Sequence, residues 1–193
     1  MKTRESGMPD EGMWRSFFDP EAILTALELD ESVLDAVDFG CGYGTFSVPA
    51  ARRVRGMLHG FDIETEMVAE CERRAQEARI QNLRLKCRDF VADGTGLPAD
   101  SVDYAMLFNI LHAEQPLTLL HEAWRILKPE GRVSVIHWNH DPTTPRGPSM
   151  DIRPRPEDCL RWVEEAGFVA EEGIIDLPPY HYGLIGRKKG KTQ

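Results

Sequence analysis

Three glycines at alternate positions, Gly40, Gly42 and Gly44, form the strongest chemical signal in the sequence. They follow a short apolar stretch that ends in Asp38 and Phe39, and a helix-forming pattern comes after them. Glycine lets the chain turn sharply out of a strand and brings bare backbone close to a ligand. The first turn of the following helix offers unpaired N–H groups at the same place. The spacing therefore favours a ligand-binding turn over a glycine-rich turn without a ligand.

Asp62 supplies the second signal, because it closes the next predicted strand twenty residues after Gly42. A carboxylate at this place can accept hydrogen bonds from both hydroxyl groups of an adenosine ribose. The alternative is that Asp62 caps the helix that begins at Glu64. We favour ribose binding because the glycine turn precedes Asp62.

The glycine spacing also distinguishes between cofactors. A dinucleotide-binding turn requires a glycine three residues after its second glycine, and this chain has Thr45 there, while Gly44 comes too early. A diphosphate needs that close approach of the backbone, whereas a ligand without phosphates does not. The Gly-Lys-Thr that ends the stretch 186–192 has the wrong spacing for a nucleoside-triphosphate loop. The pattern therefore favours a ligand without phosphates.

Strand and helix patterns alternate along the chain and would position these residues. Apolar or alternating stretches predict strands over 33–39, 57–61, 83–87, 103–108, 132–138, 168–175 and 182–187. Apolar residues at helical spacing predict helices over 21–29, 46–54, 64–78, 117–127 and 157–166. A long proline-rich loop is predicted over 139–156.

This order of elements predicts a Rossmann-like, doubly wound α/β fold around a mostly parallel seven-stranded sheet with right-handed crossovers. The last two strands have no helix between them, so one strand near the C-terminus is expected to run antiparallel. The length of 193 residues fits a single domain, 1–193. We divide it into an N-terminal lid or helix (1–30), a cofactor-binding core (31–137), and an acceptor loop with C-terminal strands (138–193).

The formal net charge of −9 disfavours nucleic acid as a partner, because a polyanion would be repelled on average. The basic run Arg187–Lys191 is interpreted as a solvated tail. The apolar runs are too short to cross a membrane, and Met1–Pro9 lacks the apolar segment of a secretory signal. The four cysteines are too scattered for a zinc site or a disulfide framework. We therefore expect no metal and a reduced, cytoplasmic setting.

Further motifs extend the pattern in a fixed order from about residue 33 to residue 137. From the N-terminus they are Asp38–Gly44, Gly60–Asp62, Gly96–Pro98, Ser101–Tyr104, Asn109–His112 and Trp124–Arg132. In this order they resemble the class I S-adenosylmethionine (SAM)-dependent methyltransferases, and the small ubiquinone- and menaquinone-type methyltransferases are the nearest by pattern. The resemblance implies that SAM is the cofactor and that its methyl group is transferred to a small-molecule acceptor.

The resemblance also implies roles for residues around the methionine part of the cofactor. The turn Gly40–Gly44, including Cys41, would pass beneath the methionine moiety, and Asp38 would help to hold its amino group. Asn109, at the end of the fourth predicted strand, would contact the methionine end and face the acceptor.

Other residues would hold the adenosine part. Asp62 would bind the ribose, Ile63 would pack on the adenine, and Asp89 would accept a hydrogen bond from the adenine amino group, with Phe90 beside it. The usual spacing of the family would place Asp93 in the role of Asp89. We prefer Asp89 because it follows the end of the third predicted strand.

Methyl transfer from a sulfonium is an in-line displacement, and the activation resides in the cofactor. The protein mainly supplies alignment and a water-poor site, although an oxygen or carbon acceptor would also need a base. The candidates are His112, His137 and His140, which lie where open α/β sheets bind ligands. The alternative is that they are structural, as we interpret His121 and His181.

Trp14, Phe17 and Phe18 precede the first predicted helix and form either a lid that excludes water or packing against an edge of the sheet. Two other functions stay open: a SAM-binding module without turnover, and an NAD(P)-dependent oxidoreductase. The sequence leaves the acceptor, the methylated atom and the oligomeric state open, a homodimer being one alternative.

Overall fold

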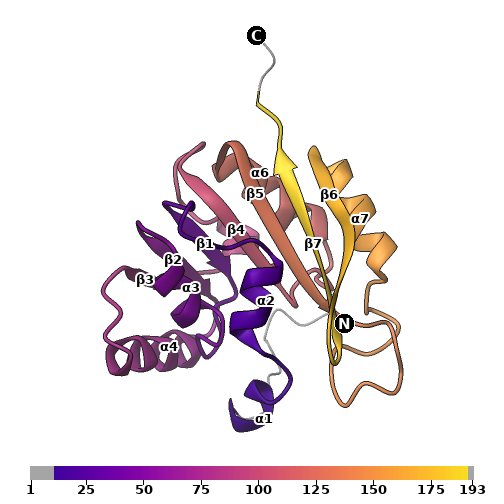
Figure 1. Ribbon diagram of the computed structural model, residues 1–193, viewed down its shortest axis with the longest axis horizontal. Helices are drawn as coiled ribbons and strands as arrows, with labels where there is room; N and C mark the ends of the chain where they lie inside the picture. Colours follow the sequence, from indigo (N-terminus) through magenta and orange to yellow (C-terminus); the bar gives the residue numbers. More distant parts are fainter. Residues whose placement is uncertain (1–10, 191–193) are drawn as a thin grey trace.

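A seven-stranded sheet with the order β3-β2-β1-β4-β5-β7-β6 organises the computed structural model, which describes residues 11–190 (Figure 1). The expectations for Met1–Pro9 and for Lys191 lie outside these residues. The interpretation of the basic run as a solvated tail is wrong for Arg187 and Lys188, because both belong to the last strand and Lys188 is buried. The strands are β1 (Ala36–Phe39), β2 (Leu58–Asp62), β3 (Leu83–Cys87), β4 (Val102–Phe108), β5 (Leu127–Trp138), β6 (Phe168–Leu177) and β7 (His181–Lys188). The helices are α1 (Glu11–Arg15), α2 (Pro20–Ala26), α3 (Ser47–Arg53), α4 (Thr65–Glu77), α5 (Phe90–Asp93), α6 (Pro116–Ile126) and α7 (Pro156–Glu165).

Strands β1 to β5 pair in parallel, and β7 runs antiparallel to both of its neighbours, β5 and β6. The reversal of β7 is visible in Figure 1, where its arrow points opposite to that of β5. The predicted fold class is therefore confirmed, including the single antiparallel strand near the C-terminus.

Two hydrophobic cores lie on opposite faces of the sheet. One packs β4 and β5 against α2 and α3, and the other packs them against α6 and α7. The alternation along β4 serves both cores, because Tyr104 and Met106 face the first and Ala105 and Leu107 face the second. Burial on both faces explains why this strand reads as a nearly continuous apolar run.

The structure differs from the predicted elements in two short helices and in several element boundaries. Helices α1 and α5 were not predicted, because each is too short to show a periodic pattern. Strand β5 begins at Leu127, which pairs with Val102 ahead of an irregularity in the ladder. Helix α2 ends at Ala26, since Glu28 adopts a positive φ and Leu29 N–H closes the helix by donating to the Leu24 carbonyl.

The loops at the carboxyl ends of the parallel strands form the lower end of the molecule in Figure 1, and α1 lies below them. Open α/β sheets bind their ligands at this end. Within residues 11–190, no helix is long and apolar enough to cross a bilayer.

Candidate functional site

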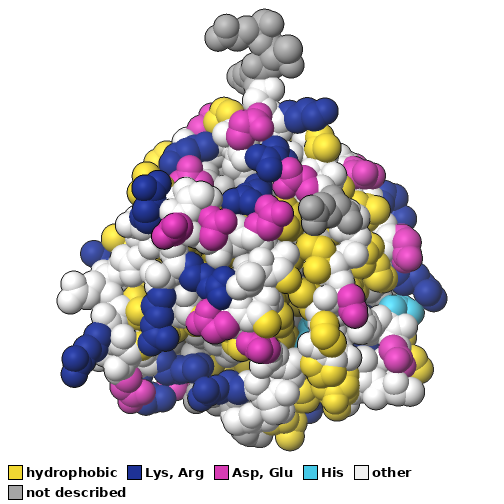
Figure 2. Space-filling view, in the orientation of Figure 1, with side chains coloured by type: hydrophobic (Ala, Val, Ile, Leu, Met, Phe, Trp, Pro, Cys, Tyr) yellow, Lys and Arg dark blue, Asp and Glu magenta, His cyan; other side chains and the backbone are white. Residues whose placement is uncertain are grey.

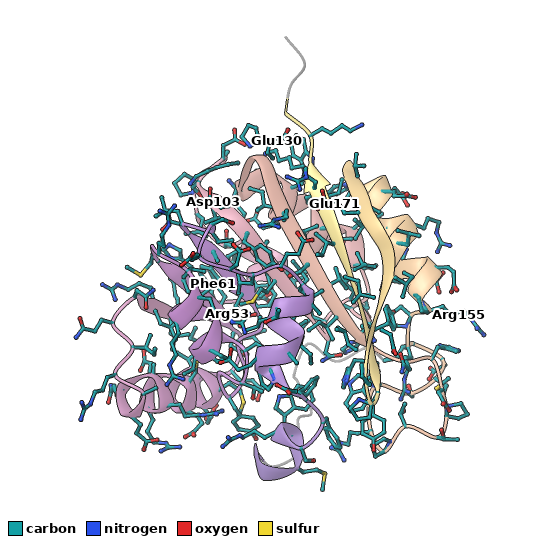
Figure 3. The ribbon with its side chains drawn as sticks, in the orientation of Figure 1. Arg53, Phe61, Asp103, Glu130, Arg155 and Glu171 are labelled. Carbon is teal, nitrogen blue, oxygen red and sulfur yellow. The ribbon has the colours of Figure 1, made fainter. Side chains whose placement is uncertain are left out.

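The glycine turn leaves β1 at the carboxyl end of the sheet and is held to the neighbouring strand. Gly40, Gly42 and Gly44 have φ values of 82°, 49° and 75°, which side chains with a Cβ rarely adopt. The N–H groups of Gly40 and Cys41 both donate to the Phe61 carbonyl, at 2.8 and 2.9 Å. These bonds fix the path of the turn between β1 and α3, and Figure 3 shows Phe61 within the body of the sheet.

Gly44 is also required by close packing. A Cβ at this position would lie 2.6 Å from the Cys71 Sγ of α4. The Cys41 side chain is buried, and its contact with the Cys71 thiol, together with burial, raises the pKa of Cys41 far above its ordinary value. The Cys41 thiol is therefore protonated and serves in packing. Only the backbone of Cys41 can contact a ligand at the turn.

Asp62 joins the glycine turn to the start of α4. Its Oδ2 accepts a hydrogen bond from Gly42 N–H at 2.9 Å, and its Oδ1 accepts from Glu64 N–H at 3.0 Å. Burial raises the pKa of this carboxyl, which is 5% exposed. The N-cap of α4 is Glu64 and no side chain caps the helix, so the capping alternative for Asp62 is not realised. Each carboxylate oxygen keeps a second lone pair, so ribose binding is compatible with the same geometry.

Asp38 is buried on β1 beside Ser47, the first residue of α3. Ser47 Oγ lies 2.5 Å from Asp38 Oδ2. Burial raises the pKa of Asp38 to about 7, and the neighbouring charge of Asp62 adds to the rise. A carboxylate in this environment is stabilised by a cationic ligand, which fits the predicted contact with an amino group.

The adenosine side of the predicted site lies beyond β2 and β3. Asp89 accepts hydrogen bonds from Val91 and Ala92 N–H at 3.2 and 3.0 Å and so caps α5. The Phe90 side chain is buried edge-on against Phe39, so only its backbone can border a ligand. Asp89 follows the strand that pairs with β2, whereas Asp93 is exposed at the other end of α5. This placement favours Asp89 for the adenine contact.

Ile63 and Asn109 follow β2 and β4 and are both partly buried. Asn109 has a positive φ of 58°, although its N–H is held by the Ile136 carbonyl at 2.8 Å. Both polar atoms of its side-chain amide are buried and lack hydrogen-bond partners. Backbone strain and an unsatisfied amide at one residue indicate a functional constraint.

The structure brings two of the three candidate bases together. His112 Nδ1 lies 3.3 Å from His137 Nε2. His137 is fully buried on β5, and burial and the neighbouring His112 hold its pKa well below the ordinary value. His140 lies apart from this pair, where its Nδ1 donates to the Arg153 carbonyl at 2.9 Å.

Buried polar atoms without partners gather at this end of the sheet. In the described part of the chain, the residues that carry such side-chain atoms are Thr45, Asn109, His137 and His181. Thr45 belongs to the glycine turn, Asn109 follows β4, and His137 lies at the end of β5. His181 begins β7 and pairs with Trp138. Because unsatisfied buried polar groups are rare in folded proteins, this end of the sheet is the candidate binding site.

Arg153 organises the proline-rich loop, a role that the sequence did not indicate. Its guanidinium is buried and donates to four backbone carbonyls and one hydroxyl of the loop. The acceptors are the carbonyls of Asn139, Asp141, Arg146 and Pro148 and the hydroxyl of Thr144. An arginine is usually a surface residue, so its type alone gives no signal of this role.

The N-terminal aromatic residues lie over the carboxyl end of β5 rather than along an edge of the sheet. The ring of Phe17 is 5.2 Å from that of Trp138, and the ring of Phe18 is 5.1 Å from that of Phe46. A hollow of about 220 Å³ adjoins them. It is lined by Arg15, Phe18, Pro20, Glu21, Thr45, Pro49 and Arg74.

A larger hollow, of about 320 Å³, lies at the opposite end of the sheet. Its walls include Asp103, Glu130, Arg132 and Arg187, and Figure 3 shows Asp103 and Glu130 at the upper end, away from Phe61. Lys128 pairs with Asp103, and Arg132 and Arg187 pair with other carboxylates. Figure 2 shows charges of both signs interspersed over this region. We therefore assign no site to it.

No group of three or more histidine, cysteine or acidic side chains within residues 11–190 is arranged to hold a metal ion. The expectation of no bound metal stays a prediction.

The chain is similar to known methyltransferases. A family model described as a methyltransferase domain matches residues 36–131. The chain is 33% identical over 101 residues to an aklanonic acid methyltransferase of Streptomyces sp. (strain C5), a match that covers 51% of this chain and 45% of that protein. It is 31% identical over 111 residues to a ubiquinone/menaquinone biosynthesis C-methyltransferase of Ruegeria sp. (strain TM1040), covering 55% and 43%. The matches thus span less than half the length of these two relatives.

A solved structure of a SAM dependent methyltransferase from Aquifex aeolicus resembles nearly the whole chain. The TM-score is 0.81, the sequences are 22% identical, and the match covers 93% of this chain and 94% of that one. At 22% sequence identity, this structural similarity supports the fold alone.

Proposed function

Because the chain belongs to the class I SAM-dependent methyltransferase family, we propose that it binds SAM at the turn Gly40–Gly44 and transfers the methyl group to a small-molecule acceptor. The observation that carries this proposal is the gathering of unsatisfied buried polar groups at the carboxyl ends of β1, β4 and β5. A binding site needs such groups, and a purely structural sheet end would have paired them.

The cofactor would be held by acidic residues on β1, at the end of β2 and just after β3. Asp38 would pair with the methionine amino group, Asp62 would accept from the ribose, and Asp89 would accept from the adenine amino group. When bound, SAM supplies the activated methyl group. The residues of the chain would then orient the acceptor and exclude water.

Where the acceptor needs a base, the geometry favours His112. If Nδ1–H of His112 donates to Nε2 of His137, the Nε2 of His112 becomes the proton acceptor. His137 is held neutral by burial and can accept this bond, so it acts as a positioning residue. The bond also stabilises the imidazolium that forms when His112 takes a proton.

Isothermal titration with S-adenosylhomocysteine, the demethylated form of SAM, tests the binding step. We expect Asp62→Ala to weaken binding by roughly 100-fold, because bonds from a carboxylate to two hydroxyls contribute about 3 kcal/mol or more. Asp103→Ala is the matched control. This carboxylate also accepts a backbone N–H, from Asp35 at 2.8 Å, but at the opposite end of the sheet. Equal binding by the Asp62 variant and the wild type would contradict the ribose assignment.

Turnover is tested separately, by mass spectrometry of a metabolite extract that has been incubated with the protein and methyl-labelled SAM. A labelled product that requires His112 supports methyl transfer. Binding without a labelled product, across broad acceptor panels, would favour a SAM-binding module. Affinity for NAD without affinity for SAM would overturn the family-based function.

A further inference from the structure

His181 is buried without hydrogen-bond partners for either ring nitrogen. It begins β7, and its register opposite Trp138 brings it to the ligand-binding end of the sheet. The cost of an unsatisfied buried donor or acceptor is about 1–3 kcal/mol. An apolar side chain would fill the same space without this cost, so the two nitrogens without partners indicate a role in binding a polar group.

Aromatic rings enclose His181 on two sides. The ring of Trp138 lies 4.3 Å from the imidazole, and the ring of Phe18 lies 4.4 Å from it with an interplanar angle of 31°. Tyr180 stacks on Trp138 at 6.3 Å and an angle of 25°. Trp138, Tyr180 and His181 therefore form a cluster of adjacent rings, with Trp138 tilted by 47° from the imidazole. We call this cluster the aromatic floor.

The segment 14–18 covers the aromatic floor from the N-terminal side. Trp14 and Phe17 contact Trp138, and Phe18 covers His181. Trp14 and Phe18 are only partly buried. The segment comprises the last two residues of the five-residue helix α1 and the three residues after it, and it precedes α2, so little regular structure holds it in place.

The same rings continue to the cofactor turn. Phe18 contacts Phe46, which comes two residues after Gly44, and Phe46 contacts Phe108 at the end of β4. A molecule on the aromatic floor would thus lie beside the place proposed for the methionine part of SAM.

We infer that the aromatic floor is the acceptor site and that it binds a flat aromatic molecule carrying a hydroxyl or carbonyl oxygen. The ring of the acceptor replaces the ring of Phe18 over His181, and its oxygen forms a hydrogen bond with the imidazole. A neutral imidazole has one donor and one acceptor nitrogen. It can therefore accept a hydrogen bond from a hydroxyl group or donate one to a carbonyl oxygen. This inference rests on the proposed function, because it places the acceptor beside the SAM site.

Charge near the aromatic floor also restricts the acceptor. Burial of the imidazole, together with the nearby charge of the Arg153 guanidinium, lowers the pKa of His181 to about 3. The imidazole is therefore neutral at physiological pH. A cationic acceptor would be repelled by Arg153, so neutral or anionic aromatic compounds fit best.

The experiment compares 2-naphthol with naphthalene as probes, in titrations followed by NMR in the presence of S-adenosylhomocysteine. We expect the wild type to bind 2-naphthol more tightly than naphthalene. In His181→Phe this preference should disappear, with at least a tenfold loss of 2-naphthol affinity, while S-adenosylhomocysteine binds as in the wild type. The melting temperature of His181→Phe should equal or exceed that of the wild type, because the unsatisfied nitrogens are gone.

Two further variants complete the test. His121→Phe makes the same chemical change on the exposed face of α6 and should leave both probes unaffected. Phe18→Ala should strengthen binding of 2-naphthol, because it removes the ring that competes for the site. A wild type that does not prefer 2-naphthol, a His181→Phe variant that keeps the preference, or a lower melting temperature of that variant would overturn the inference. A wild-type protein that does not bind S-adenosylhomocysteine would instead overturn the proposed function.

Discussion

At the scale of single residues, burial sets the charge of the groups that would meet a ligand. Asp38 and Asp62 lie close together out of contact with water, and burial raises the pKa of both carboxyls. Burial has the opposite effect on imidazoles: it lowers the pKa of His137 and His181, so both rings are neutral. The site therefore carries less charge than its residue types suggest, and a cationic amino group beside Asp38 would favour the ionised form of this carboxyl.

This effect predicts a pH dependence of cofactor binding. The pKa of Asp38 is about 7 without ligand, so below pH 7 a proton must leave before the carboxylate can pair with an ammonium group. We expect the affinity for S-adenosylhomocysteine to fall about tenfold for each pH unit below 7 and to level off above it. Calorimetry between pH 5.5 and pH 8.5 measures the effect.

Asp38→Asn is the control for this dependence. It should bind S-adenosylhomocysteine more weakly at pH 8 and lose the dependence near pH 7. A wild type whose affinity is constant from pH 5.5 to pH 8.5 would show that Asp38 does not meet the amino group.

At the scale of elements, the loop 139–155 is ordered by one side chain rather than by regular structure. Arg153 lies near the C-terminal end of the loop, and its bonds to Asn139, Arg146 and Pro148 tie that end to the start and the middle. The planar guanidinium has five N–H donors in a fixed arrangement and can serve all of its acceptors in the loop at once, whereas an ammonium group has only three donors. The loop is therefore preorganised beside His140, whose ring is bonded to the Arg153 carbonyl.

Limited proteolysis tests this role. Within the loop, trypsin can cut after the exposed Arg146, because Arg153 and Arg155 are followed by proline. We expect Arg153→Met and Arg153→Lys to be cut after Arg146 at least tenfold faster than the wild type. Arg161→Met, which alters an exposed arginine of α7, should be cut at the wild-type rate. Equal rates in all four proteins would mean that the proline-rich backbone orders itself.

At the scale of the whole molecule, the parallel sheet gathers the turns after β1, β2, β4 and β5 at one end, and the reversal of β7 adds His181 to them. The upper part of the molecule carries paired charges of both signs, and hydrophobic side chains gather over β6 and β7 in the lower right of Figure 2. A ligand that spans several strand ends would thus stabilise the folded chain as a unit.

Because the ligand would contact several strand ends, we expect it to raise the melting temperature of the protein substantially. S-adenosylhomocysteine at about 100 times its dissociation constant should stabilise the fold by about 2.7 kcal/mol. For a domain of this size that corresponds to a rise in the melting temperature of roughly 5–10 °C. Differential scanning calorimetry with and without the compound measures it. A shift of less than 1 °C at saturation would contradict binding across the strand ends.

The sequence by itself determined the succession along the chain of the seven strands and of the five longer helices, the turn at Gly40–Gly44 and the position of Asp62 at the end of β2. Each of these depends on residues close together in the chain: alternation along a strand, helical spacing, and glycines where φ must be positive. Such local requirements can be recognised directly from the sequence. The single antiparallel strand was predictable for the same reason, because no helix separates the last two strands.

Only the tertiary structure decided which distant side chains meet. His112 and His137 come together because β4 and β5 are neighbours, while His140 is drawn away by the loop around Arg153. Phe18 reaches His181 from the other end of the chain, so a histidine interpreted as structural became the floor of a candidate acceptor site. Such contacts depend on the packing of elements far apart in sequence, and no local periodicity records them.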